Sequence, residues 1–220
     1  MSRRDEILGR LRTRLGRDAA NAADGRAQID AILAAQTPGP RPPLEAEKSS
    51  LVERFVAKSL AQASSVDRVT DLHEAPGAVA RYLAGQGLPA RAVVWPALAH
   101  LDWAAAGLSI EARGARDGDL VGITGCFCAL AETGTLMLCS GPLMPASVSL
   151  LPETHIALVP ESRIVAGMEE GFRLARAELG QLPRAVNFIS GPSRTGDIEQ
   201  TIVLGAHGPY RVHLILLKAA

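Results

Sequence analysis

Residues 154–189 read THIALVPESRIVAGMEEGFRLARAELGQLPRAVNFI, and this stretch decides the fold class. Thr154–Val159 is an apolar run of strand length. In Gly167–Leu179 the apolar residues recur at helical spacing, and Ala185–Ile189 is a second short apolar run. Apolar strands that alternate with helices are typical of parallel sheets that are covered on both faces. The stretch therefore predicts an α/β fold with a mostly parallel sheet.

The same alternation extends toward both ends of this stretch. The spacing predicts further helices over Ser49–Gln62, Ala75–Ala84 and Pro145–Leu150. Leu120–Leu130 is predicted to run from a loop into a helix. Apolar runs predict the remaining strands, which are Ser65–Val69, Ala92–Trp95, Leu108–Ala112, Gly134–Cys139, Arg163–Val165 and Val212–Leu217.

The N-terminal part follows a different pattern. Asp5–Arg17 and Gln28–Ala35 are predicted helices, and the first is amphipathic with a basic face. Four of the seven residues in 37–43 are Pro, which predicts a stiff linker. We therefore divide the chain into a helical N-terminal arm with a Pro-rich linker, residues 1–47, and an α/β domain, residues 48–220.

The amino-acid composition limits the classes of function that this chain can have. The 220 residues include 23 Lys+Arg and 23 Asp+Glu, and only 4% are aromatic, which argues against a nucleic-acid partner. The N-terminus has no signal-like apolar region behind it. The longest uncharged stretch, Thr133–Pro152, contains three Pro and does not suit a membrane span. We expect a cytoplasmic protein without a membrane span.

The sequence contains few motifs that are typical of cofactor or metal binding. Cys126, Cys128 and Cys139 do not follow the spacing of zinc or iron–sulfur ligands, and free cysteines in such apolar segments are usually buried. A Rossmann dinucleotide fingerprint and a Walker A loop are both missing from the sequence. Gly122–Gly125 resembles a glycine loop that enters a helix. We expect no metal and no cofactor in this chain.

The strongest candidate for a binding site is Ser190-Gly191-Pro192-Ser193-Arg194-Thr195, which directly follows a predicted strand. Backbone N–H groups in such a turn and one guanidinium can hold a carboxylate or a phosphate. We therefore predict that Ser190, Gly191, Ser193, Arg194 and Thr195 bind a small anion. The alternative interpretation is a helix start that is capped by Ser193 or Thr195.

Glu132 is the candidate catalytic residue. Apart from the cysteines, it is the only readily titratable side chain between Asp119 and Glu153. A carboxylate in so apolar a stretch suits general acid or base chemistry, or attack on an acyl group. The alternative is a carboxylate at a helix end that is bonded to Thr133 or Thr135.

His207 lies in Gly205–Pro209, where flanking glycines allow a close approach of the backbone. It is a further ligand-binding candidate, and an ordinary turn explains the same residues. Ligands of parallel sheets bind beyond the carboxyl ends of the strands. We predict that the Ser190–Asp197 loop lies there and that the loops around Glu132, Arg194 and His207 form one pocket; the Glu132 loop precedes its strand, so the end of the sheet that it occupies is left open. His155 opens a strand and is interpreted as structural.

Five segments together resemble the LUD-domain family. The resemblance covers about residues 66–218 and is most specific in the Ser190–Thr195 block and the turn that follows it. The five segments are Gly122–Gly125, Ala131–Thr135, Leu151–Ile156, Ile189–Glu199 and Gly205–Pro209. The resemblance implies a Rossmann-like, three-layer α/β/α fold similar to the CoA-transferase and ribose-5-phosphate isomerase group.

The resemblance also implies a role in bacterial oxidation of L-lactate to pyruvate, beside partner subunits that carry iron–sulfur clusters. One hypothesis is a cluster-free accessory or ligand-binding subunit of that complex. The alternative is a self-sufficient, CoA-transferase-like enzyme in which Glu132 is the nucleophile or base and Arg194 holds the substrate. A small-molecule sensor that uses the same pocket is a third hypothesis. Whether the chain is itself an enzyme stays open at this point.

Overall fold

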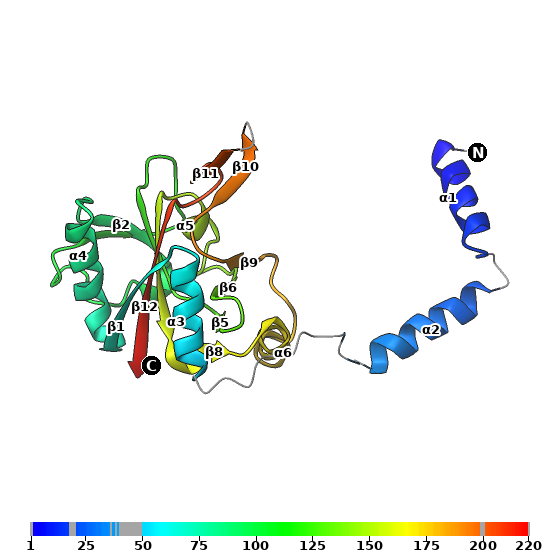
Figure 1. Ribbon diagram of the computed structural model, residues 1–220, viewed down its shortest axis with the longest axis horizontal. Coiled ribbons are helices and arrows are strands. Elements are labelled where there is room, and N and C mark those ends of the chain that lie inside the picture. The colour runs from blue at the N-terminus through cyan, green and yellow to red at the C-terminus, as the bar shows by residue number, and fades with distance from the viewer. Residues whose placement is uncertain are drawn as a thin grey trace. The chain divides into compact units, whose positions relative to one another are not determined.

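The computed structural model describes residues 2–17, 21–35, 37, 39, 50–198 and 201–219. The chain divides into two compact units, Met1–Glu45 and Ala46–Ala220. The first unit contains α1 (Arg3–Arg14) and α2 (Ala22–Ala35), which confirms the two predicted helices (Figure 1). The boundary predicted between residues 47 and 48, and most of the Pro-rich linker, lie outside the described residues.

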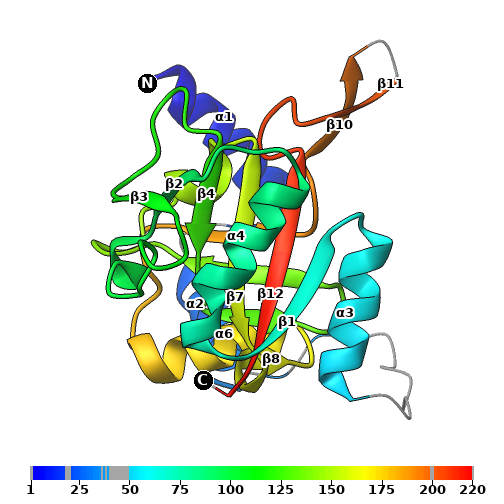
Figure 2. The same ribbon diagram turned by 90° about the vertical axis from the view of Figure 1, so that its left-hand side faces the viewer.

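A parallel sheet forms the centre of the second unit. In the described residues it has six strands in the order β1-β12-β7-β4-β2-β3, and each neighbouring pair is parallel (Figure 2). The predicted α/β fold with a mostly parallel sheet is therefore confirmed. The bounds of the strands are β1 (Ser65–Asp71), β2 (Arg91–Val94), β3 (Ser109–Ala112), β4 (Val121–Thr124), β7 (Thr154–Pro160) and β12 (Arg211–Ala219).

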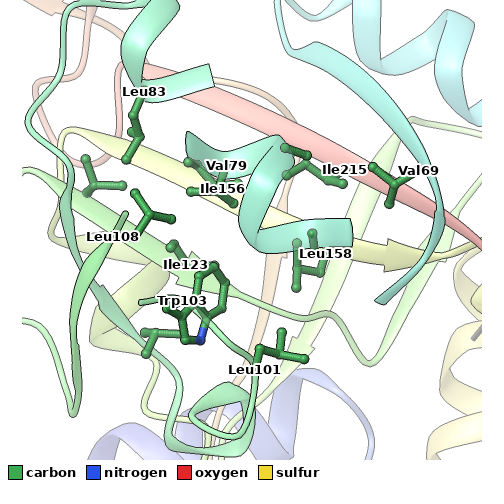
Figure 3. Packing of buried hydrophobic residues seen from close by; sticks show 14 of the residues in the cluster. Val69, Val79, Leu83, Leu101, Trp103, Leu108, Ile123, Ile156, Leu158 and Ile215 are labelled. Carbon is green, nitrogen blue, oxygen red and sulfur yellow. The ribbon is translucent and has the colours of Figure 1, made fainter. Parts of the chain in front are cut away.

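One face of this sheet is covered by α4 (Ala75–Gly85). Val79 and Leu83 of this helix pack against Ile123, Ile156 and Ile215, which belong to three different strands (Figure 3). All five side chains are almost completely buried. Because side chains alternate across a strand, the neighbours of these strand residues point to the opposite face.

That opposite face packs against α3 (Leu51–Ala61) and a second sheet, which the sequence did not predict as a separate layer. The order of the second sheet is β8-β5-β6-β9, with β5 and β9 both antiparallel to β6. Its strands are β5 (Cys128–Leu130), β6 (Thr135–Cys139), β8 (Ile164–Val165) and β9 (Val186–Ile189). Helix α6 (Met168–Leu179) packs on its outer side through Ala175, beside Met137 and Cys128. Cys128 and Cys139 are buried, Cys126 is partly buried, and all three are free thiols.

The helix predicted within Leu120–Leu130 is wrong, because β4 and β5 occupy this segment. Both strands are buried on both sides, and a short, fully apolar run has the same appearance in a buried strand as in a buried helix. Gly122 lies inside β4, where a Cβ would be 2.0 Å from the backbone oxygen of Val148. The glycine is needed for the packing of α5 (Ser147–Leu150) against the sheet, not for a glycine loop.

The helix start considered at Ser193–Thr195 is also wrong. The chain forms an antiparallel hairpin of β10 (Arg194–Ile198) and β11 (Thr201–Leu204), which stands out from the body of the second unit (Figure 1). Three 3₁₀ turns complete the described elements: η1 (Leu72–Glu74), η2 (Pro96–Leu98) and η3 (Glu161–Arg163). Within the described ranges, every helix is too short or too polar to cross a lipid bilayer.

Candidate functional site: two loops held at the end of helix α3

The C-terminal end of α3 reverses the chain sharply. The N–H of Ser64 donates to the oxygen of Ser59 at 3.1 Å, and the N–H of Ala63 donates to the oxygen of Leu60 at 3.0 Å. Ala63 has a φ of 64°, the left-handed conformation that usually follows a helix with these two bonds. The reversal directs the chain into β1 and leaves Gln62 at the helix end, facing two loops.

Gln62 connects these two loops. Its side-chain Nε2 donates a hydrogen bond to the backbone oxygen of Thr133, in the turn between β5 and β6. Its backbone oxygen accepts a hydrogen bond of 3.1 Å from Nη2 of Arg194, at the start of β10. The C-cap residue of α3 thereby contacts both segments that the sequence indicated as chemically important.

Two glycines allow this close approach. Gly134 has a φ of 66°, and a Cβ on it would be 2.6 Å from the backbone nitrogen of Ser59. Gly191 has a φ of 78°, and a Cβ on it would be 2.4 Å from the oxygen of Gln62. Both distances are too short for any side chain, and both φ values favour glycine. The predicted importance of Gly191 thus has a steric cause in this structure.

A chain of hydroxyl groups joins the loops on their other side. Oγ1 of Thr133 lies 2.7 Å from Oγ1 of Thr135, which lies 2.7 Å from Oγ of Ser190. Thr135 is buried, whereas Ser190 is exposed. Thr133 is exposed as well, so these hydroxyl groups run from the surface through the buried Thr135 back to the surface at Ser190, and they can orient the Ser190 hydroxyl toward a bound molecule.

The turn that carries His207 also contacts this loop. The N–H of Ser193 donates to the oxygen of Pro209 at 2.8 Å, and the N–H of Gly205 donates to the oxygen of Ser193 at 2.9 Å. The structure therefore brings the Ser190–Arg194 loop and the His207 turn together through the backbone. The His207 side chain is exposed, and Thr195 is paired with Val203 inside the hairpin.

Glu132 points to a different part of the unit. Its backbone N–H donates to the oxygen of Ala166 at 2.9 Å. Its Oε2 lies 2.9 Å from the place of a Cβ on Gly167, where Glu169 and Glu170 also place carboxylate oxygens. The contacts of the Glu132 side chain thus lead to the start of α6. The residue belongs to a turn between two strands, so its interpretation as a helix-end carboxylate is wrong.

The two loops lie near the amino ends of the parallel strands. Gln62 precedes the first residue of β1 by three positions, and Pro209 precedes the first residue of β12 by two. The location predicted at the carboxyl ends is therefore wrong for the central sheet. The reason is that Ser190 follows β9, which belongs to the second sheet.

Two hollows lie at the carboxyl ends instead. One, of about 340 Å³, is lined in part by Thr70, Glu161 and Lys218. The other, of about 380 Å³, is lined in part by Cys126 and Arg163. Burial and the neighbouring Cys128 raise the pKa of the Cys126 thiol to about 12, which makes this thiol a poor nucleophile. Glu132, Arg194 and His207 line neither hollow, so their common pocket stays a prediction.

His155 is a structural residue, as the sequence predicted. It is completely buried, its Nε2 lies 2.8 Å from Oγ1 of Thr124, and burial lowers its pKa to about 4. Glu153, two positions earlier, is exposed whereas His155 faces the core, so the two side chains do not form a pair of metal ligands. Within the described ranges no three His, Cys, Asp or Glu side chains are grouped as a metal site would require.

Comparison with known proteins identifies the family. The chain belongs to the LUD domain family, whose model matches residues 52–217. It is 46% identical over 99 residues to lactate utilization protein C of Shouchella clausii, a match that spans 44% of this chain and 43% of the relative. Lactate utilization protein C of Bacillus subtilis is 43% identical over 101 residues, or 44% of this chain and 42% of the relative. These matches therefore span less than half of each curated relative.

A solved structure is similar over a larger part of the chain. It is a DUF162 family protein from Deinococcus radiodurans, with a TM-score of 0.60 and 27% identity. The superposition covers 76% of this chain and 96% of that protein. The family resemblance seen in the sequence motifs is confirmed, and so is the α/β fold.

Sequence reasoning missed Gln62. Glutamine at the end of a predicted helix is an ordinary surface residue, and nothing in its local sequence indicates two partners that lie 71 and 132 positions away. The paired glycines were the only available signal. They show that some backbone approaches the loops closely, but they do not identify it.

Proposed function

We propose that this chain acts in bacterial L-lactate utilisation and binds a small carboxylate, such as L-lactate, at the Ser190–Arg194 loop. Support for the pathway comes from the relatives that are named lactate utilization protein C. Support for the site comes from Arg194. Its exposed guanidinium is anchored to Gln62 at the end of a rigid helix, so that a carboxylate can be bound without ordering a free side chain.

The hydroxyl chain adds a second group to this site. Ser190 is four residues from Arg194, and its hydroxyl is held by Thr135, which is itself held by Thr133. A 2-hydroxy acid presents a carboxylate and a hydroxyl on adjacent carbons. We assign the carboxylate to Arg194 and the 2-hydroxyl to Ser190. In this arrangement Gln62 is a positioning residue. It holds both loops in place, and only Arg194 and Ser190 contact the ligand.

We further propose that iron–sulfur partner proteins carry out the electron transfer and that this chain is a cytoplasmic, cluster-free component. The support is the environment of the cysteines. Cys128 and Cys139 are buried in the packing beneath α6, and burial raises the pKa of the Cys128 thiol to about 11. Metal ligation requires thiolates, so these residues suit packing rather than cluster binding.

The alternative is a self-sufficient enzyme with Glu132 as nucleophile or base. We prefer the accessory role, because the contacts of Glu132 lead to α6, whereas Arg194, the proposed anion-binding group, contacts Gln62. The two hypotheses differ in the effect of one substitution. Glu132→Gln removes the carboxylate charge at nearly constant volume, so it abolishes function only if Glu132 takes part in the chemistry.

Growth tests the proposed role. A Bacillus subtilis strain that lacks its own lactate utilization protein C is supplied with this chain and grown on L-lactate as the carbon source. We expect growth with the unchanged chain and with Glu132→Gln, and loss of growth with Arg194→Ala. Failure of the expressed, folded chain to support growth would contradict the proposed role. Loss of growth with Glu132→Gln would favour the enzyme instead.

A further inference from the structure

The N-terminal unit exposes two apolar stripes. Ile7 and Leu11 of α1 and its C-cap residue Leu15 are 52%, 50% and 68% exposed, and they recur every four residues along one side of the helix. In α2 the equivalent stripe is formed by residues that are 46–71% exposed, namely Ile29, Ile32 and Leu33. Neither helix buries any residue. Soluble proteins rarely leave contiguous apolar surface of this kind uncovered.

Helix α1 is stabilised locally rather than by packing. The Ser2 hydroxyl accepts from the N–H of Asp5 at 3.2 Å, and the Asp5 carboxylate accepts from the N–H of Ser2 at 3.0 Å, which completes a capping box. Arg10 and Glu6 form an ion pair one turn apart. The capping box and the ion pair stabilise the helical conformation without any packing of the apolar stripe. The stripe is therefore available for contact with another molecule.

The two stripes meet at one hollow. Leu15, at the end of α1, and Ile29, in α2, both line a concave surface of about 760 Å³. Arg12, Arg17 and Arg26 lie around the same hollow. The hollow therefore brings one end of each apolar stripe together and borders them with charged side chains.

We propose that this surface binds the same unit of a second copy of the chain, so that two α1–α2 pairs form a four-helix arrangement. Each copy supplies two helices of similar length, 12 and 14 residues, whose stripes are not covered within their own unit and can cover each other when two such units meet. The six stripe side chains expose apolar surface on the order of several hundred Å² per copy, which approaches what a stable interface buries.

The charges of the helices favour a second copy of the chain as the partner, and they determine which helices of the two copies meet. Helix α1 has five Arg against two acidic residues, whereas α2 has one Arg against two Asp. Contact between α1 of one copy and α2 of the other is therefore attractive, and contact between two copies of α1 is repulsive. A membrane surface is a poorer fit, because residues 1–45 contain no Trp, Tyr or Phe, the aromatic anchors that interfacial helices commonly use.

Sedimentation equilibrium of the full chain tests the proposal with matched variants. Leu11→Asp places a charge on the stripe, whereas Thr13→Asp places the same charge on the opposite side of α1. Ile32→Asp and Ala31→Asp make the same comparison in α2. All four positions belong to the first unit, and none of these side chains is buried within it. Circular dichroism of each variant verifies that helix content is retained.

We expect the unchanged chain, Thr13→Asp and Ala31→Asp to sediment at twice the chain mass of 23.1 kDa, and Leu11→Asp and Ile32→Asp to sediment as monomers. A monomeric unchanged chain would overturn the proposal. A dimer that persists in both stripe variants would overturn it as well, because the copies would then meet elsewhere. Binding of the monomer to phosphatidylserine vesicles, lost in Leu11→Asp, would assign the stripe to a membrane.

Discussion

The backbone oxygen of Gln62 accepts a hydrogen bond of 3.1 Å from Nη2 of Arg194, across 132 residues of sequence. The same residue uses its side chain to hold Thr133. The end of one helix therefore sets the distance between two loops that belong to different strands of the second sheet. The proposed anion site depends on this arrangement, because a guanidinium that is already oriented loses less side-chain entropy on binding.

The close approach at Gly191 predicts a large loss of stability in Gly191→Ala. The new Cβ would be 2.4 Å from the oxygen of Gln62, in addition to the strain of a φ of 78°. We expect a loss of about 2–4 kcal/mol in the free energy of unfolding, measured by urea denaturation. Gly107→Ala is the matched control, because its φ is 75° and no atom lies near the new Cβ. Equal losses in the two variants would show that Gln62 does not restrict this position.

Ala63 predicts a stabilising substitution. Its φ of 64° costs about 1 kcal/mol for a residue with a Cβ, and glycine is the preferred residue where a helix ends in this way. We therefore expect Ala63→Gly to raise the free energy of unfolding by about 0.5–1 kcal/mol, after the greater flexibility of the unfolded chain is included. An unchanged or lower midpoint in thermal unfolding would show that the helix end is not strained.

Two buried histidines predict a dependence of stability on pH. Burial lowers the pKa of His155 and of His213 to about 4 from the usual 6.5. Both are neutral in the folded chain, so stability is fully present above about pH 6.5. As the pH falls from 6.5 to 4, the unfolded chain binds protons that the folded chain does not. The free energy of unfolding then decreases by about 1.4 kcal/mol per pH unit for each histidine.

Urea denaturation between pH 7 and pH 4.5 measures this slope. His213 stacks on Tyr82 with ring centroids 3.8 Å apart, and its Nδ1 lies 2.8 Å from Oγ of Ser65. His213→Gln should lower stability at pH 7 and also flatten the slope, because one titrating group is removed. If the slope of the variant equals that of the unchanged chain, His213 does not contribute to the acid sensitivity.

The chain of hydroxyl groups predicts that Thr135→Val lowers both the stability of the protein and its affinity for a 2-hydroxy acid. This substitution keeps the shape of the buried side chain but removes the partner of both Thr133 and Ser190. We expect a loss of about 1–2 kcal/mol in the free energy of unfolding and weaker binding of a 2-hydroxy acid. Propionate, which lacks the 2-hydroxyl, is the control ligand. Its affinity should not change, and an equal decrease for both ligands would contradict the assignment of the hydroxyl to Ser190.

The sequence predicted the helices and strands in which apolar residues recur with a clear period. Strand β7 and helix α6 lie where the alternation of apolar runs placed them. The parallel sheet followed from this alternation. The second sheet did not, because its pairing of β6 with β9 joins residues about 50 positions apart, and no local pattern reports such a contact.

Two errors have a common physical cause. Strands β4 and β5 are buried on both sides, and a Ser/Thr-rich segment such as Ser193–Thr195 caps a helix as readily as it enters a hairpin. In both cases tertiary packing selects the structure. Tertiary packing also limited the prediction of the candidate site. The residue types indicated an anion-binding loop, but the end of the sheet at which this loop lies and the role of Gln62 depend on the fold.

Isothermal titration calorimetry with L-lactate tests the central claim most directly. The unchanged chain is compared with Arg194→Ala and with Arg81→Ala, a control that removes an exposed Arg on α4. We predict saturable binding that is weakened about 10- to 100-fold in Arg194→Ala and unchanged in Arg81→Ala, as the loss of a charge-assisted bond requires. Equal affinity in all three proteins, or no saturable heat with the unchanged chain, would contradict an anion site at Arg194.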